Sequence, residues 1–367
     1  METIRLLFLL SVIIYGCKSE STTEITDENN NLSKDSIYIG GRFTIDGKDS
    51  INNIAFWDGK TWNSLGTGVT GGNVDVECMA YYNGELFVGG FIDSAGGIPV
   101  QNIARWDGNK WSSIGSGING RVTSLLVYDG ELYAGGWFSS AGGFQADNIA
   151  KWNGMNWSSV GEGLSDEVYT LEVFNNELYA GGWFTKNSLG NFSADKIAKW
   201  DGIKWDTVGN GMSSGIPGAG WVHNLTIFNN ELYASGNFNK SDSVSVVNIA
   251  KWNNNIWQSI DGANLSNRTY SSKNFKNEIH FAGENDSNLP NTLPYYAVWN
   301  GAIWDFNLFS FDDSPYCLCS SDNYLFVGGN FKTVSGIMVN GIFKWNGSTI
   351  QNLDSGVNGF VSSILLK

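Results

Sequence analysis

Short stretches in which apolar and polar residues alternate follow one another along most of the chain. In one unit they are VTSLLVY (residues 122–128), ELYAGG (131–136), NIAKW (148–152) and NWSSVG (156–161). Alternation on this scale, with many β-branched and aromatic side chains, predicts β-strands. An Asp-Gly pair follows the first stretch and an Asn-Gly pair the third, and such pairs tolerate the positive φ angles of tight hairpins. The unit therefore predicts a four-stranded antiparallel meander.

This unit is repeated along the chain. Residues 131–138, ELYAGGWF, recur unchanged at 177–184, and successive Gly-Gly sites or their variants lie 49, 46, 46, 54, 47 and 46 residues apart. A tryptophan followed five positions later by a second large residue recurs at the same spacing, and thirteen of the sixteen tryptophans belong to these pairs. We interpret those tryptophans as packing residues. Seven copies are present, starting near residues 36, 85, 131, 177, 231, 278 and 324.

Four-stranded units repeated every 40–50 residues or so are typical of β-propellers. The first copy begins at SIYIGG, which matches the second strand of the other copies, and the last residues, 359–367, match the missing first strand. Pairing these two segments would satisfy both open sheet edges. The sequence therefore predicts an all-β fold, a seven-bladed β-propeller of four-stranded antiparallel blades over residues 36–367, closed by the C-terminal strand pairing in the first blade.

The sequence motif of the repeat, LYAGGWF…NIAKWNG…W, resembles the kelch-type propeller motif. It resembles more closely the propeller repeats of secreted and surface bacterial proteins and of fungal cell-cortex ectodomains. The resemblance covers residues 36–367. It departs from kelch repeats at Trp152, where those usually have tyrosine. Kelch-type propellers include copper oxidases and plain binding scaffolds, so the resemblance implies the fold and leaves the chemistry open.

The N-terminus carries an export pattern. Arg5 precedes an apolar run of ten residues, 6–15, which is too short to span a bilayer and reads as a signal-peptide core. The end of residues 1–17, IYGC, resembles the bacterial lipobox, which implies lipidation of Cys17; the alternative is an ordinary signal peptide with a chance cysteine. Residues 18–35 are polar and lack aromatic side chains, which predicts a disordered tether. We therefore expect an outer-membrane lipoprotein of the bacterial cell envelope, held by its lipid anchor only.

The charge of the chain limits its partners. The formal net charge is −14 and the pI is about 4.5. Because phosphate contacts dominate nucleic-acid affinity, this charge argues against nucleic acid as a partner. A monomer that binds a glycan or a protein is expected.

Repeat proteins place function where their copies differ. In a propeller the first strand of each blade lines the central channel, and the copies differ most where these strands begin, at the channel mouth; deeper positions are expected to be apolar or small. Aligning the copies gives two rings of mouth residues, one with Asp75, Arg121, Glu167, Trp221, Arg268, Ser314 and Phe360, the other with Glu77, Thr123, Tyr169, His223, Tyr270, Tyr316 and Ser362. The residues predicted to contact a ligand are Asp75, Glu77, Arg121, Glu167, Tyr169, Trp221, His223, Arg268, Tyr270 and Tyr316.

Several chemistries are compatible with this set. Glycan binding would use Trp221 and the tyrosines for stacking. A uronate lyase would use His223 or Tyr270 as base and acid, with Arg121 or Arg268 on the carboxylate. A glycosidase would pair two of Asp75, Glu77 and Glu167. The polar groups could also simply bond one another at the rim. We favour a non-enzymatic binding module, with a polysaccharide-active enzyme as the alternative and a structural part of an envelope complex as a third reading.

No metal or cofactor is predicted. The chain has two histidines, His223 and His280, and no pair of Cys or His residues at the spacing of zinc ligands. Calcium binding by the Asp- and Asn-rich loops is an alternative that the sequence leaves open. Cys78, Cys317 and Cys319 are expected to be free, buried thiols. The longest insertion, residues 212–220, reads either as a lid beside the mouth or as a tolerated surface loop.

Overall fold

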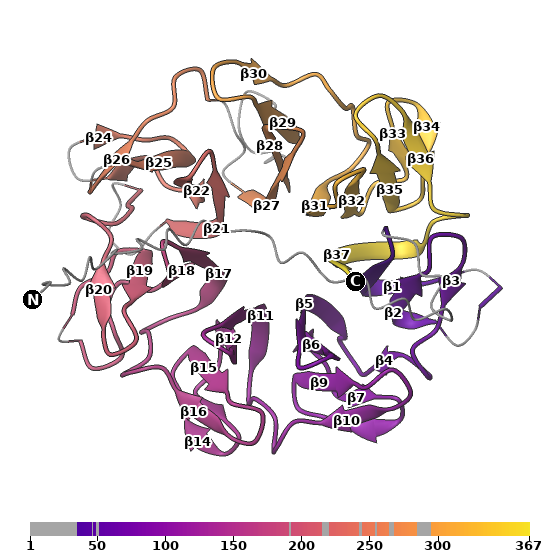
Figure 1. The fold of residues 1–367 in the computed structure, drawn as a ribbon, viewed down its shortest axis with the longest axis horizontal. Coiled ribbons are helices and arrows are strands. Elements are labelled where there is room, and N and C mark those ends of the chain that lie inside the picture. The colour runs from indigo at the N-terminus through magenta and orange to yellow at the C-terminus, as the bar shows by residue number, and fades with distance from the viewer. Residues whose placement is uncertain are drawn as a thin grey trace, which may run out of the picture. The chain divides into compact units, whose positions relative to one another are not determined.

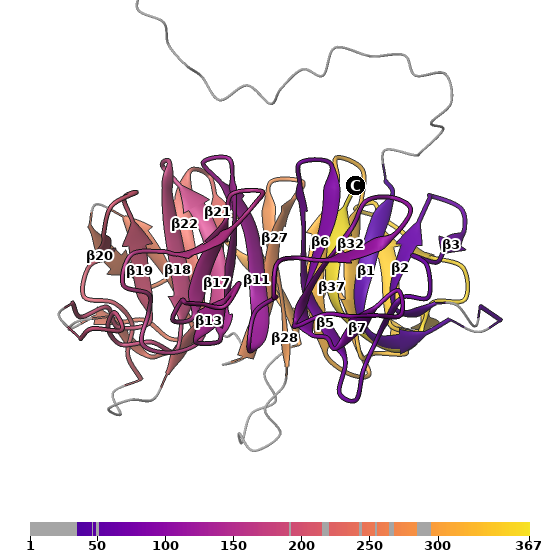
Figure 2. The same cartoon turned by 90° about the horizontal axis from the view of Figure 1, so that it is seen from below.

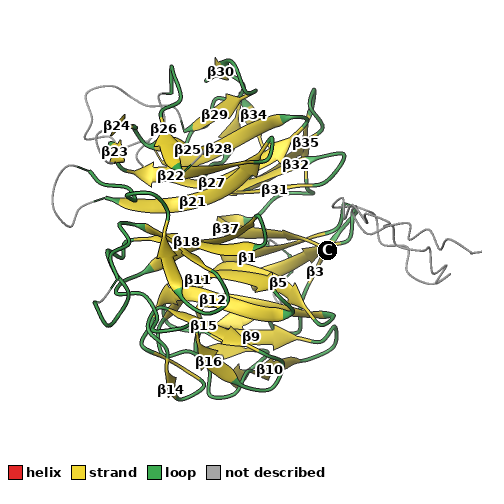
Figure 3. Cartoon of the chain, turned by 60° about the vertical axis from the view of Figure 1, so that its left-hand side comes forward, coloured by secondary structure: helices red, strands yellow, loops and turns green. Residues whose placement is uncertain are grey.

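The computed structural model describes residues 35–45, 47–48, 51–190, 192–214, 220–241, 244–253, 255–263, 268–284 and 295–367. Residues 33–367 form one compact unit. Within the described residues this unit is built from strands and loops without a helix (Figure 3), and no helix there could span a membrane. The predicted signal peptide, Cys17 and residues 18–34 of the tether lie outside the described residues, as do residues 215–219 of the longest insertion.

Seven four-stranded antiparallel sheets of the described chain are arranged as blades around a centre (Figure 1). Taken innermost strand first, the blades are as follows: blade 1, β37 (Asn358–Leu366), β1 (Ile37–Thr44), β2 (Asn52–Trp57) and β3 (Trp62–Asn63); blade 2, β5 (Asp75–Tyr82), β6 (Glu85–Phe91), β9 (Ile103–Trp106) and β10 (Trp111–Ser113); blade 3, β11 (Arg121–Tyr128), β12 (Glu131–Trp137), β15 (Ile149–Trp152) and β16 (Trp157–Ser159); blade 4, β17 (Val168–Phe174), β18 (Glu177–Gly182), β19 (Ile197–Trp200) and β20 (Trp205–Thr207).

The remaining blades follow the same order: blade 5, β21 (Trp221–Phe228), β22 (Glu231–Asn237), β25 (Ile249–Asn253) and β26 (Ile256–Gln258); blade 6, β27 (Arg268–Phe275), β28 (Glu278–Glu284), β29 (Tyr296–Trp299) and β30 (Trp304–Asp305); blade 7, β31 (Pro315–Ser320), β32 (Leu325–Gly329), β35 (Ile342–Trp345) and β36 (Ile350–Asn352). Short strands decorate the loops: β4 (Val69–Thr70), β7 (Ser94–Ala95), β8 (Ile98–Pro99), β13 (Ser140–Ala141), β14 (Phe144–Gln145), β23 (Lys240–Ser241), β24 (Val244–Ser245), β33 (Thr333–Val334) and β34 (Ile337–Met338). The predicted seven-bladed β-propeller is confirmed.

The two ends of the propeller meet in blade 1. Strand β37 pairs antiparallel with β1, from Ile37 opposite Leu366 to Thr44 opposite Asn358. The amide of Lys367 extends this ladder by donating to the carbonyl of Ser36 at 3.0 Å. In Figure 1 the yellow C-terminal strand lies beside indigo β1. The chain's last strand thus supplies the inner strand of the blade that its first residues open.

The Gly-Gly sites explain how neighbouring blades pack. A Cβ on the first glycine of the pair would lie only 2.3 to 2.8 Å from a valine of the next blade. The pairs are Gly40 with Val76, Gly89 with Val122, Gly135 with Val168, Gly181 with Val222, and Gly328 with Val361. These valines have no exposed surface. The repeated glycine therefore makes room for the neighbouring inner strand, and the core lies between the blades.

The outer tryptophans link each blade to the one before it. The second tryptophan of a pair donates its indole N–H to a backbone carbonyl of the preceding blade or of the loop that leaves it. Examples are Trp62 to Leu353 at 3.1 Å and Trp111 to Leu65 at 2.7 Å. Ile350 replaces this tryptophan in blade 7. Their predicted role in packing is confirmed.

The propeller has two distinct faces, seen edge-on in Figure 2. We call the end where the inner strands begin, at residues such as Asp75 and Arg121, the mouth face. The opposite end carries the hairpin turns after the inner strands, and we call it the turn face. The inner strand β37 ends at the turn face, and the next residue, Lys367, is hydrogen-bonded to Ser36. Both ends of the described chain therefore lie on the turn face.

The isolated titratable groups of the core fit the predictions. Cys78, Cys317 and Cys319 are free and buried, as expected. His280 on β28 has no exposed surface, and its Nδ1 lies 2.8 Å from the Tyr296 hydroxyl. Burial lowers the pKa of His280 to about 4, so this ring is neutral in the folded protein.

Candidate functional site

The beginnings of the inner strands converge on a cavity of about 350 Å³ at the mouth face. It is lined by Asp75, Glu77, Arg121, Thr123, Tyr169, His223, Tyr270, Tyr316, Phe360 and Ser362. Seven of the ten residues predicted to contact a ligand are therefore in one cavity. Of the other three, Glu167 contacts Arg121, Trp221 packs against His223, and the side chain of Arg268 is outside the described part of the structure.

One half of the cavity wall is a belt of aromatic rings. The ring centroids are 4.7 Å apart for Tyr169 and His223, 5.2 Å for His223 and Tyr270, 5.0 Å for Tyr270 and Tyr316, and 4.5 Å for Tyr316 and Phe360. The belt runs through blades 4, 5, 6, 7 and 1 in order. The Tyr270 hydroxyl donates to Glu284 at 2.5 Å, which holds its ring. Aromatic faces of this kind are surfaces on which sugar rings can stack.

The other half of the wall is charged. The Nε–H of Arg121 is shared between the two carboxylate oxygens of Glu77, at 2.7 and 2.9 Å, and its Nη1 donates to Glu167 at 3.1 Å. Asp75 is held by Arg42 at 3.1 Å and by the Ser362 hydroxyl at 2.9 Å. Each predicted charged residue with a described side chain therefore has a partner of opposite charge. Charge-assisted hydrogen bonds to two different carboxylates hold the guanidinium of Arg121 in place.

Burial strongly affects the acids of this cluster. Burial raises the pKa of Glu77 to about 7; the charges of Asp75 and Glu167 add to this, while Arg121 opposes it. Burial also raises the pKa of Glu167 and, together with Glu167, that of Tyr169. Burial alone would lower the pKa of Arg121, but the contacts with Glu77 and Glu167 raise it, so Arg121 stays charged. Glu77 is thus a mouth group whose charge changes near neutral pH.

This shift makes a prediction about stability. The folded protein holds the Glu77 proton more tightly than the unfolded chain, whose glutamate pKa is 4.5, so stability from this group falls as pH rises from 4.5 to about 7. Glu77→Gln has no proton to titrate there. We expect the difference in melting temperature between about pH 5 and about pH 8 to be smaller for Glu77→Gln than for the wild type. Equal differences for the two proteins would show that Glu77 does not titrate in this window.

A third ring of mouth residues was not predicted. It is formed by the residue directly after each Gly-Gly site. At three of these positions the side chain contacts the first-ring residue of the next blade: Arg42 bonds Asp75, Phe91 lies 5.9 Å below the Arg121 guanidinium, and Trp183 lies 6.2 Å from Trp221. The residues of this ring are Arg42, Phe91, Trp137, Trp183, Asn237, Glu284 and Asn330. The sequence signal was present, because three successive copies place Phe, Trp and Trp there.

The expectation that deeper channel positions are apolar or small is wrong for two inner strands. Glu172 on β17 and Lys273 on β27 are both deeper than the mouth residues. Burial raises the pKa of Glu172. The positive charge of Lys273 opposes this increase, which means that the two charges are close enough to interact. A charged pair thus contributes to the channel wall below the mouth cavity.

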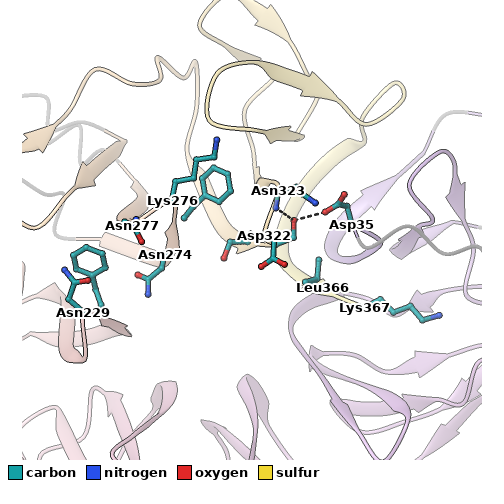
Figure 4. Close-up of a pocket in the computed structure, with 13 residues that line it drawn as sticks. Asp35, Asn229, Asn274, Lys276, Asn277, Asp322, Asn323, Leu366 and Lys367 are labelled. Atoms are coloured by element: carbon teal, nitrogen blue, oxygen red, sulfur yellow. Dashed lines mark hydrogen bonds between the residues drawn. The ribbon is translucent and has the colours of Figure 1, made fainter. Parts of the chain in front are cut away.

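The turn face carries a larger cavity, of about 740 Å³ (Figure 4). Its lining comes from hairpin turns, among them Asn229, Lys276 and Asn323, and from the chain end at Lys367. These groups are engaged with the scaffold: Lys276 donates to the carbonyl of Asn346 at 2.6 Å, and Ser321 donates to Asp35 at 2.8 Å. Asp35 lies in this cavity, so the preceding chain joins the propeller here. We assign it to the connection rather than to a ligand.

Metal ligation has no geometric support among the described residues, where no group of three or more His, Cys, Asp or Glu side chains is placed to hold an ion. The acids at the mouth are instead paired with arginines, as described above. The arrangement can stack planar or ring-shaped ligands on its aromatic half and exchange hydrogen bonds on its charged half.

No protein-family model matches the chain, and no curated protein matches it. Similar solved structures include the computationally designed Ika8 protein (15% identity, TM-score 0.46, covering 82% of this chain and 78% of that chain) and the WD40 β-propeller domain of Doa1 (15%, 0.47, 81% and 87%). YjhT is also similar (14%, 0.45, 79% and 100%). The assignment of the fold rests on the strand pairing of this chain itself.

Proposed function

We propose that the protein is a binding module that takes a glycan at the mouth cavity. The observation that carries the proposal is the division of this one cavity into an aromatic belt and a charged cluster, on a scaffold whose blades otherwise repeat. Stacking surfaces beside fixed polar groups match the needs of sugar rings, which have apolar faces and hydroxyl edges. A protein ligand is the alternative occupant, and the acidic charge of the chain disfavours nucleic acid.

The proposed cellular setting is the bacterial envelope. The lipobox-like end of residues 1–17 supports lipidation of Cys17, with residues 18–35 as tether to a monomeric kelch-like propeller. Because Asp35 and Ser36 join the propeller on the turn face, the tether would attach opposite the mouth.

A polysaccharide-active enzyme is the second candidate. The observation in its favour is that His223, Tyr270 and Arg121 line the same cavity, with 5.2 Å between the first two rings. Against it, Arg121 is bound to two carboxylates and Tyr270 to Glu284, so neither is poised for a substrate. Binding without turnover is therefore the better-supported function.

The test is retention on a panel of immobilised acidic and neutral polysaccharides, with the detergent-solubilised full chain. We expect retention by at least one polysaccharide without new chain ends, and weakening of about tenfold or more for Tyr270→Ala. Tyr128→Ala is the matched control, because Tyr128 ends the inner strand β11 at the turn face. New unsaturated or reducing ends would establish the enzyme instead, and absence of retention would overturn glycan binding.

A further inference from the structure

A groove of about 680 Å³ lies beside the mouth, between blades 3 and 4. Its walls include Phe91, Arg121, Trp137, Asp147 and Lys186. Arg121 also lines the mouth cavity, so one residue borders both spaces. A ligand longer than the mouth cavity can therefore continue into this groove without leaving the surface.

Trp137 is the most prominent feature of the groove. It is 62% exposed, although it ends strand β12 and its backbone pairs with Arg121. Tryptophan combines a large apolar face with a polar N–H and is enriched at interaction surfaces. Trp137 is also one of the tryptophans that the repeat pattern does not use.

The propeller contains an internal comparison for this groove. The equivalent space between blades 7 and 1 is lined by Asn330 and Lys332, which correspond to Trp137 and Ser139, and has a volume of about 380 Å³. Both grooves use the same strand positions of the repeat. The scaffold therefore does not require an aromatic residue there, and the groove at Trp137 is a specialised one.

The charges of the groove indicate the class of ligand. Lys186 is exposed, and its ammonium has no carboxylate partner within the part of the chain that the structure describes. Arg121 is already bound to Glu77 and Glu167, so Lys186 is the lining cation to which a ligand can bind, and Asp147 is the lining acid. A lysine ammonium in the same groove as the exposed Trp137 offers a partner for the carboxylate of an acidic sugar, which a neutral sugar lacks.

We propose that the groove between blades 3 and 4 is an extended subsite for a linear acidic polysaccharide, whose chain leaves the mouth, stacks one sugar ring on Trp137 and places a carboxylate at Lys186. This inference rests on the proposed glycan binding at the mouth. It adds the direction of the chain and its chemical class. The mouth would hold one part of the chain and the groove the next.

The test measures the affinity of the full chain for galacturonate oligomers and for neutral cello-oligosaccharides, each from dimer to hexamer. We expect the wild type to bind hexagalacturonate more tightly than digalacturonate. Trp137→Ala should weaken hexagalacturonate binding by about tenfold while leaving digalacturonate within about twofold. Lys186→Gln should weaken the galacturonate hexamer and leave cellohexaose unchanged.

Two controls match the variants. Asn330→Ala alters the equivalent position in the groove between blades 7 and 1, and Phe144→Ala removes an aromatic side chain of blade 3 that is 64% exposed but outside the groove. Neither should change hexamer affinity. If Trp137→Ala leaves the hexamer as tightly bound as in the wild type, the groove proposal is overturned while mouth binding stands. If no oligomer binds at any length, both proposals fail, and if Lys186→Gln is without effect, the acidic class is wrong.

Discussion

Deleting residues 359–367 is expected to leave a protein that does not unfold cooperatively and that self-associates. These residues make up most of β37, which contributes the inner strand of blade 1. Without them β1 exposes an unpaired edge along its whole length, and such edges recruit other chains. Val361, which has no exposed surface and packs at Gly328 of blade 7, is lost as well. The interface between blades 7 and 1 therefore disappears together with the sheet pairing.

Size-exclusion chromatography and calorimetric melting measure this effect. Deletion of Lys367 alone is the control, because it removes one hydrogen bond to Ser36 and leaves the rest of the ladder. Val361→Asp tests the same interface without shortening the chain and should also lower the melting temperature strongly. A nine-residue deletion that stays monomeric and melts within a few degrees of the wild type would contradict this account of how the fold is held together.

The second large effect is expected from Gly136→Ala. A Cβ at Gly136 would lie 2.0 Å from the backbone carbonyl oxygen of Arg121, at the point where the register of β11 and β12 shifts. Backbone atoms must move to admit it, which costs about 3 kcal/mol of unfolding free energy. The shift would also displace Arg121, so ligand binding at the mouth should weaken in the same variant.

Denaturant unfolding gives the free energies for this comparison. Gly72→Ala is the matched control, since no atom lies within 4 Å of a Cβ built there. It should stay within about 0.5 kcal/mol of the wild type. If Gly136→Ala is equally mild, the backbone at the mouth is softer than the close contact indicates.

The blade number, the four strands of each blade and the closure could be predicted because the repeat shows one pattern seven times. Strand spacing, Gly-Gly sites and tryptophan pairs each agreed across the copies, and the missing first strand of the first copy pointed to residues 359–367. The location of the mouth followed in the same way, because equivalent positions on the inner strands must meet around one axis.

The contacts within the site could not be predicted from the repeat. Glu77 and Arg121 come from adjacent blades, and their ion pair depends on rotamers and burial that alignment does not encode. Trp137 was missed for a different reason. It lies on a second strand, and an antiparallel second strand ends on the face where the inner strand begins, so both strands supply mouth residues.

Amide hydrogen exchange with and without the retained polysaccharide tests most directly whether the mouth is the binding face. The account predicts slower exchange in the loops that lead into the inner strands, residues 71–75, 117–121 and 163–167, and no change at the turns around Asn229 and Asn323 on the opposite face. Protection at those turns, or at the outer edges of the blades with the mouth unaffected, would contradict it.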